Sequence, residues 1–156
     1  MQFYSTNRKT SPVSLREAVV RGLAADRGLF MPEVIRRFPP AFYQNMKEMT
    51  LREISFVVAE AFFGEDVEAG KLKEIVDETL NFDIPLVQVA GNRYSLELFH
   101  GPTLAFKDVG ARFMARLLAY FNKQEGERQV NVLVATSGDT GSAVANGFLD
   151  VPGVKV

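Results

Sequence analysis

Lys107 follows a run of turn-forming and apolar residues, and a lysine in such a place could serve as a nucleophile. The run reads His100-Gly-Pro-Thr-Leu-Ala-Phe-Lys107-Asp108, and a long helical pattern begins at the lysine. A lysine amine reacts well when it is partly desolvated, because burial disfavours the ammonium form. A helix N-terminus disfavours a positive charge in the same way. The sequence therefore indicates a lysine able to form a Schiff base, and a surface lysine paired with Asp108 is the plainer alternative.

A second polar segment, Thr136-Ser137-Gly138-Asp139-Thr140-Gly141, lies between an apolar run and another helical pattern. Free backbone N–H groups at such a strand-to-helix junction can hold a carboxylate or a phosphate. Asp139 would repel an anion, so we expect it to accept a hydrogen bond instead, for example from a phenolic hydroxyl. Together, the lysine and the loop indicate chemistry on pyridoxal phosphate (PLP) and an amino-acid substrate. Alone, the loop is also typical of an ordinary turn between a strand and a helix.

The inventory of other reactive side chains is short. The chain has no cysteine, which excludes disulfides and thiol catalysis, and its one histidine makes a metal site built from the protein unexpected. A lone histidine is usually structural, but the position of His100 shortly before Lys107 leaves a role at the site open.

The composition excludes several classes of partner. The chain has 156 residues, of which 47% are apolar and 24% charged, and its net charge is −1. This balance offers no basic surface for nucleic acid or for an anionic membrane. No apolar run approaches the roughly 20 residues that a membrane span needs, and no signal-peptide pattern opens the chain. We therefore expect a cytoplasmic protein with a small-molecule substrate.

Residues 1–80 carry mostly helical patterns. Ser14 with Glu17 and Thr50 with Glu53 are capping boxes, in which a hydroxyl and a glutamate satisfy free backbone N–H groups at a helix start. Asp66 is placed to cap the helix that follows, and prolines predict a loop over residues 38–40. Leu72, Ile75, Val76 and Leu80 recur at helical spacing, as a buried helix face requires.

After residue 80 the pattern changes to alternating strands and helices. Residues 86–89 and 94–99 read as two strands of a hairpin around Gly91-Asn92. Residues 130–135 are nearly all apolar, as in a strand buried on both faces, and a helix over 140–149 and a strand from Val154 follow. Because the last strand stops at once, we expect the 156 residues to be the front part of a longer protein. A natural chain ending in a short edge strand is the alternative.

These residues give the chain a resemblance to a known family. It resembles the N-terminal part of the threonine synthases, of the longer kind found in bacteria and fungi, which are fold-type II PLP enzymes. The resemblance spans essentially the whole chain and is most specific from Glu97 to Asp108 and from Ala135 to Gly141. It implies a truncated α/β fold. A helical N-terminal domain over residues 1–80 would precede the beginning of a catalytic domain over 81–156, with the three-layer sheet of tryptophan synthase β-like enzymes.

The resemblance also implies roles for matched residues. Lys107 would hold PLP as an internal aldimine and then act as the general acid and base at the substrate Cα and its neighbouring carbons. Asp139 would face the hydroxyl of the cofactor ring, which agrees with the acceptor role argued above. The substrate carboxylate would be bound by Thr136, Ser137, Gly138, Thr140 and Gly141.

The implied reaction converts O-phospho-L-homoserine and water to L-threonine and phosphate. In the family, the loop that holds the PLP phosphate and the partner of the pyridine nitrogen lie further along the chain. Charge-assisted hydrogen bonds are worth about 1.5–3 kcal/mol each, so losing this anchor should cost several kcal/mol of PLP binding. We therefore expect the 156 residues alone to bind PLP weakly or not at all and to show no turnover.

Two other functions stay open. Another fold-type II PLP lyase, such as an O-phosphohomoserine phospho-lyase, would need the same lysine and loop but would release phosphate without adding water. A non-catalytic interaction module built on the helical first eighty residues would be indifferent to Lys107→Ala and to PLP. The sequence does not indicate an oligomeric state.

Overall fold

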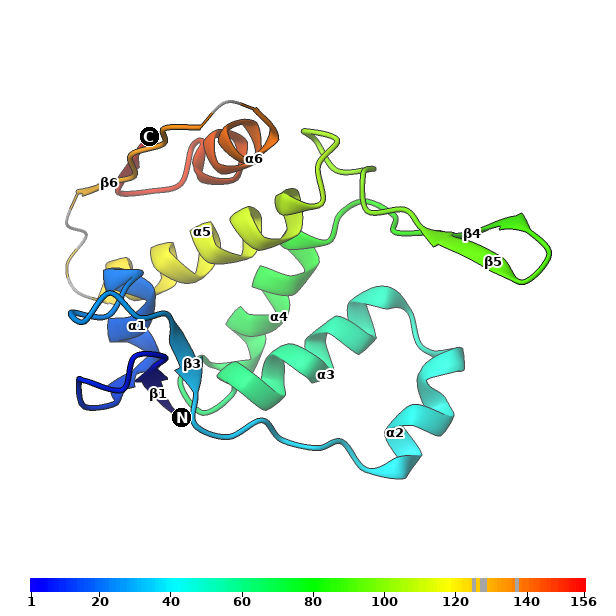
Figure 1. Cartoon of the computed structure of the whole chain (residues 1–156), viewed down its shortest axis with the longest axis horizontal. Coiled ribbons are helices and arrows are strands. Elements are labelled where there is room, and N and C mark those ends of the chain that lie inside the picture. The colour runs from blue at the N-terminus through cyan, green and yellow to red at the C-terminus, as the bar shows by residue number, and fades with distance from the viewer. Residues whose placement is uncertain (125, 127–128, 137) are drawn as a thin grey trace. The chain divides into compact units, whose positions relative to one another are not determined.

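Residues 1–124, 126, 129–136 and 138–156 are described by the computed structural model of this chain. The chain divides into two units, Met1–Asp77 and Glu78–Val156. Figure 1 shows the elements of both in chain order, from blue at the N-terminus to red at the C-terminus. Each unit is described by itself below.

A small antiparallel sheet opens the first unit. Its strands are β1 (Gln2–Ser5), β2 (Val13–Ser14) and β3 (Phe30–Pro32), in the order β2-β1-β3. Phe3 pairs with Val13 on one side and with Pro32 on the other. Phe3 and Ser5 are buried, as alternation along a strand requires.

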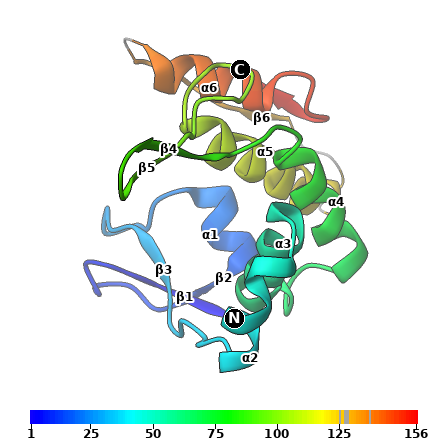
Figure 2. The same cartoon turned by 90° about the vertical axis from the view of Figure 1, so that its right-hand side faces the viewer.

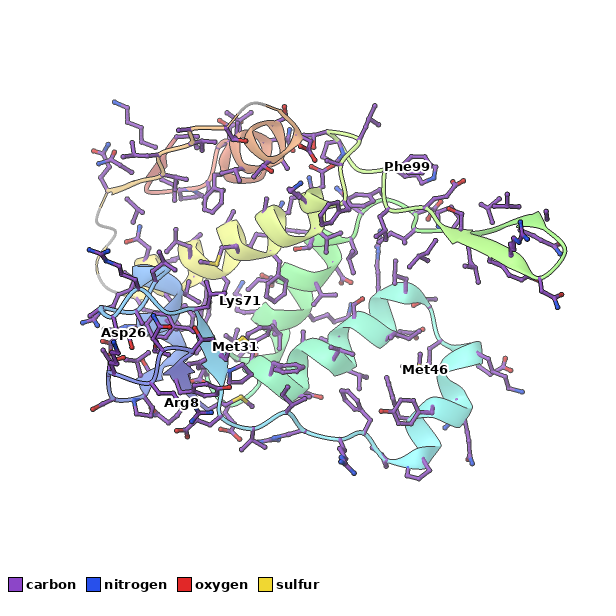
Figure 3. All side chains as sticks on the ribbon, viewed as in Figure 1. Arg8, Asp26, Met31, Met46, Lys71 and Phe99 are labelled. Atoms are coloured by element: carbon purple, nitrogen blue, oxygen red, sulfur yellow. The ribbon has the colours of Figure 1, made fainter. Side chains whose placement is uncertain are left out.

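Asp26 ties this sheet to the loop that precedes β3. Its carboxylate accepts hydrogen bonds from Ser5 Oγ at 2.5 Å, from Lys9 N at 2.9 Å and from Gly28 N at 3.0 Å. Figure 3 labels Asp26 in the same region as Arg8 and Met31. Ser5 is fully buried, so this polar cluster lies partly inside the unit.

Helices make up the rest of the first unit. They are α1 (Leu15–Arg21), α2 (Pro40–Asn45), the 3₁₀-helix η1 (Met46–Glu48), α3 (Leu51–Phe63) and α4 (Ala69–Thr79), whose last two residues belong to the second unit. Ser14 Oγ accepts from Glu17 N at 3.2 Å. Both hydrogen bonds of the Thr50–Glu53 capping box are present, so this prediction is confirmed.

Two local predictions in this unit need correction. The loop predicted over residues 38–40 is confirmed at Phe38 and Pro39, but α2 begins at Pro40. Proline is tolerated in a first helical turn because its missing N–H would have no partner there. Asp66 does not cap α4. Its Oδ2 accepts from the amino group of Met1 at 3.0 Å, and Glu68 Oε1 accepts from Gly70 N instead.

The second unit begins with a hairpin and continues as a strand-helix-strand unit. Its elements are β4 (Leu86–Ala90), β5 (Arg93–Leu96), α5 (Lys107–Gln124), β6 (Val130–Asn131), α6 (Asp139–Phe148) and β7 (Val154–Lys155). β4 and β5 are antiparallel, whereas β6 and β7 are parallel. The predicted hairpin, the helix starting at Lys107 and the parallel crossover are therefore confirmed, although β5 ends at Leu96 and not at residue 99 as predicted. Figure 2 shows the hairpin and, within the same unit, α6 alongside α5.

The two helices α5 and α6 meet at small residues. A Cβ added to Gly147 would lie 2.9 Å from the carbonyl carbon of Ala111 and 3.0 Å from its Cβ. Ala115 and Ala143 are fully buried as well. Backbones can approach closely only where such side chains face each other, so these positions hold α6 against α5.

The prediction of a long buried strand over residues 130–135 is wrong for this structure. β6 has two residues, and the side chain of Leu133 is 94% exposed. A strand is buried on both faces only when other elements cover each face. Among the described residues β6 pairs only with the two-residue β7.

Candidate functional site

The turn that leads into α5 is fixed by Asp108. This aspartate is fully buried, and both of its oxygens are used by one residue: Thr103 Oγ1 donates to Oδ1 at 2.6 Å, and Thr103 N donates to Oδ2 at 2.9 Å. Leu104, between them, has a positive φ of 57°. Lys107 therefore stands at the first position of a helix, and the turn before that helix is fixed by hydrogen bonds to the buried Asp108.

Lys107 forms its ion pair with Asp139, not with its neighbour Asp108. Lys107 Nζ donates to Asp139 Oδ2 at 2.8 Å, with the lysine side chain 33% exposed and the aspartate 63% exposed. The hydrogen bond and the charge of Lys107 lower the pKa of Asp139. Lys107 Nζ also lies 4.6 Å from the ring centroid of Phe106, within cation–π range. The structure thus joins the two sequence motifs through this pair.

An open hollow of about 480 Å³ lies beside this pair. Its lining is mostly apolar and comes from the start of α5 and from α6: Phe106, Lys107, Gly110, Ala111, Met114, Val144 and Phe148. The volume falls within the range of about 300–1,000 Å³ that small-molecule sites occupy. The Lys107 amine on this apolar wall, paired with the Asp139 carboxylate, can bind a planar carbonyl compound.

The loop before α6 supplies the other predicted residues. Gly138 precedes the helix with extended backbone angles, and Ser142 N donates to Gly138 O at 3.2 Å as α6 begins. A Cβ on Gly141 would lie 2.7 Å from Thr136 Cγ2, so the loop folds closely onto the helix there. Thr140 stands in the first turn. Ser137 lies outside the described residues.

His100 lies on the segment between the hairpin and α5. Its Nε2 is 2.6 Å from Glu97 Oε2, and its ring stacks on that of Phe99, with centroids 4.8 Å apart. Figure 3 labels Phe99 on this segment. These contacts with Glu97 and Phe99 indicate a structural role for His100. Among the described residues, no contact between His100 and Lys107 is seen.

Sequence reasoning missed the walls of the hollow, although a signal was present. Gly110, Ala111 and Met114 follow Lys107 at the spacing of one helix face, so they share its side of α5. Val144 and Phe148 stand four positions apart on α6 in the same way. What the spacing does not reveal is that these two faces meet.

Two further findings come from the described residues. No helix there is both long enough and apolar enough to cross a membrane. No group of three or more histidine or acidic side chains is arranged in that part of the chain so that it could hold a metal ion.

Crystal structures define the fold class of the chain. The structure of threonine synthase from Escherichia coli matches with a TM-score of 0.90 and 39% identity, covering 99% of this chain and 36% of that one. The PLP-bound threonine synthase from Brucella melitensis matches with a TM-score of 0.92 and 34% identity, covering 99% and 34%. The chain therefore has the α/β fold of the N-terminal part of fold-type II PLP enzymes, as predicted.

The particular family follows from sequence matches. A family model described as the threonine synthase N terminus matches residues 2–80, and the chain belongs to the threonine synthase family. Threonine synthase of Escherichia coli strain K12 is 39% identical over 156 residues, and that of Saccharomyces cerevisiae is 38% identical over 175 residues. The chain spans 36% and 34% of these two relatives, about a third of their length.

Proposed function

We propose that the protein acts in threonine synthesis, converting O-phospho-L-homoserine and water to L-threonine and phosphate with PLP. The observation that carries the proposal is the pair of Lys107 and Asp139 beside an apolar hollow, in a chain of the threonine synthase family. The cytoplasmic location expected from the sequence remains part of this proposal.

The residues present fit a PLP ring. The hollow is large enough, and its wall is apolar apart from the Lys107 amine, which is paired with the Asp139 carboxylate. When bound, PLP supplies an electron sink for carbanions formed on the substrate. Lys107 would be attached to the aldehyde carbon of the cofactor, and Asp139 would accept a hydrogen bond from the ring hydroxyl.

The remaining tasks fall to the same few residues. Once freed by the substrate amine, the Lys107 amine would take and return protons at the substrate Cα. It stands at a helix start, contacts Asp139 and Phe106, and already lines the hollow. The substrate carboxylate would be bound by the loop of Thr136, Ser137, Gly138, Thr140 and Gly141, from backbone N–H and hydroxyl groups.

We further propose a division of labour along the chain. Residues 1–80 would form the N-terminal domain, and residues 81–156 would begin the PLP-dependent catalytic domain. Lys107, Asp139 and the loop all belong to the second part, which is where the hollow lies.

The proposal can be tested in a chimera, since the chain aligns with the first third of its relatives. The chimera joins this chain to the part of Escherichia coli threonine synthase that follows the aligned 156 residues. With PLP and O-phosphohomoserine, we expect threonine and phosphate in equal amounts. A 2-keto acid instead of threonine would show a phospho-lyase, and no turnover from a folded chimera would contradict the proposal.

Matched lysine variants complete the test. Lys107→Ala should abolish turnover, whereas Lys123→Ala, at the opposite end of the same helix, should leave it unchanged. If Lys107→Ala keeps the turnover of the parent chimera, as Lys123→Ala should, Lys107 is not the catalytic lysine and the proposed site is wrong.

A further inference from the structure

We propose that Asp108 is a positioning residue for Lys107. Its carboxylate fastens the turn over residues 100–106 to the start of α5 and thereby sets the direction in which Lys107 leaves the helix. The inference rests on the proposed function, because it assigns a second residue to the placement of the same lysine.

The first step of the argument is the burial of a charge. Asp108 has no exposed surface, and burying a carboxylate is costly unless it is hydrogen-bonded. Thr103 meets both oxygens, with distances of 2.6 Å and 2.9 Å. Arg112, one turn further along α5, interacts with Asp108 electrostatically while it donates to Thr79 O and Glu78 O. The buried carboxylate is therefore compensated by the hydrogen bonds from Thr103 and by the positive charge of Arg112.

The second step is the closeness of the turn to Asp108. A Cβ added to Gly101 would lie 2.5 Å from Asp108 Oδ2 and 3.0 Å from Phe82 Cζ. Only a glycine allows the chain to pass so near the carboxylate. Leu104 adopts a left-handed φ of 57°, a conformation that a branched side chain keeps only when its surroundings fix it. The hydrogen bonds from Thr103 to Asp108 provide that restraint.

The third step concerns direction. Successive residues of an α-helix point about 100° apart, since 3.6 residues make one turn. With Asp108 turned inward, Lys107 therefore lies on a different face of α5, where it lines the hollow and pairs with Asp139. The same arrangement removes the carboxylate that would otherwise pair with the lysine next to it in the sequence.

Variants of Asp108 and Thr103 distinguish the effect of the hydrogen bonds between them from the effect of the Asp108 charge. In Asp108→Asn, the amide oxygen can accept from Thr103 N while the amide nitrogen donates to the hydroxyl of Thr103, which can rotate to accept. The arrangement should survive without the charge. Thr103→Val removes one hydrogen bond at constant shape, Thr103→Ser keeps it, and Asp108→Ala removes both.

The first readout needs no cofactor. In the 156-residue chain, the Asp139 carboxyl is titrated by NMR, because the hydrogen bond from Lys107 lowers its pKa. In Asp108→Ala and Thr103→Val we expect the pKa of Asp139 to rise toward the value found in Lys107→Met, whereas Asp108→Asn and Thr103→Ser should keep the wild-type value. An unchanged pKa of Asp139 in a folded Thr103→Val would overturn the proposal, even if Asp108→Ala fails to fold.

The second readout uses the chimera with PLP. Borohydride trapping on Lys107 should slow at least about tenfold in Thr103→Val, because a misplacement of about 1 Å can cost roughly a hundredfold in rate. We expect kcat to fall while KM changes little. If wild type traps PLP on Lys107 and Thr103→Val traps it equally fast, the positioning role is wrong. If wild type itself does not trap PLP, the proposed function fails instead.

Discussion

Lys107 and Asp139 lie 32 positions apart in the sequence, yet Lys107 Nζ and Asp139 Oδ2 are 2.8 Å apart in the structure. Each stands at the first position of a helix, α5 or α6. The two helices also pack against each other further along, where Gly147 near the end of α6 lies against the backbone of Ala111. The pair is therefore the point at which both sequence motifs become one site.

The first prediction concerns this pair. Lys107 lowers the pKa of Asp139, so the stabilisation from the pair is complete above the ordinary pKa of aspartate and is lost as the pH falls through the lowered value. In Lys107→Met the pKa of Asp139 should return to its ordinary range. NMR titration of the carboxyl carbon measures this directly. An unchanged pKa would mean that the two side chains do not meet in solution.

The second prediction concerns Asp26. The hydrogen bond from Ser5, followed by those from the backbone of Lys9 and Gly28, lowers the pKa of Asp26. Its stabilising effect should be present at neutral pH and should disappear as the pH falls through that lowered pKa.

Urea unfolding of wild type and Asp26→Asn over a range of pH tests this. The wild type should be more stable at neutral pH, and the difference should shrink as the pH falls through the lowered pKa of Asp26 and the wild-type carboxylate is protonated. Glu33→Gln, a change at an exposed carboxylate of the same unit, is the control and should show no such trend. A constant difference between wild type and Asp26→Asn would contradict the account.

The third prediction concerns the contact between α5 and α6. Gly147→Ala places a methyl group against the backbone of Ala111, and overpacking of this kind costs about 1–3 kcal/mol. Gly110→Ala meets nothing within 4 Å and should stabilise α5 by about 0.5–1 kcal/mol through its higher helix propensity. Thermal unfolding of both variants provides the comparison. Equal stability of the two would show that the helices are not packed as described.

The fourth prediction concerns the start of α3. Thr50 Oγ1 accepts from Glu53 N at 3.3 Å, and Glu53 Oε2 accepts from Thr50 N at 2.7 Å. Thr50→Ala should lower the free energy of unfolding by about 0.5–2 kcal/mol. Thr50→Ser keeps the hydroxyl, so its free energy of unfolding should stay close to that of the wild type. Chemical denaturation of both variants measures the difference, and a harmless Thr50→Ala would show that the cap contributes nothing.

Local signals in the sequence predicted many elements correctly. The Thr50–Glu53 box, the start of α5 at Lys107 and the buried face of Leu72, Ile75 and Val76 each depend on residues close together in the chain. Such patterns are visible in one sequence because helix caps and helix faces repeat at fixed short spacings.

The failures have non-local causes. Residues 130–135 read as a buried strand, but burial depends on what covers the faces, and Leu133 is exposed here. Aspartate is a common helix-capping residue, but Asp66 accepts a hydrogen bond from the amino group of Met1, 65 positions away. The pairing of Asp108 with Thr103 was hidden for another reason, since an aspartate beside a lysine suggests a neighbouring ion pair. Only the turn at residues 100–106 reveals the actual partner.

The most direct test of the account is the identity of the lysine that reacts with PLP. The chimera is incubated with PLP, reduced with borohydride, digested and mapped by mass spectrometry. We predict one adduct, on Lys107, and its absence in Lys107→Ala, while Lys123→Ala keeps it. A folded chimera that carries the adduct on another lysine, or carries none, would contradict the central claim.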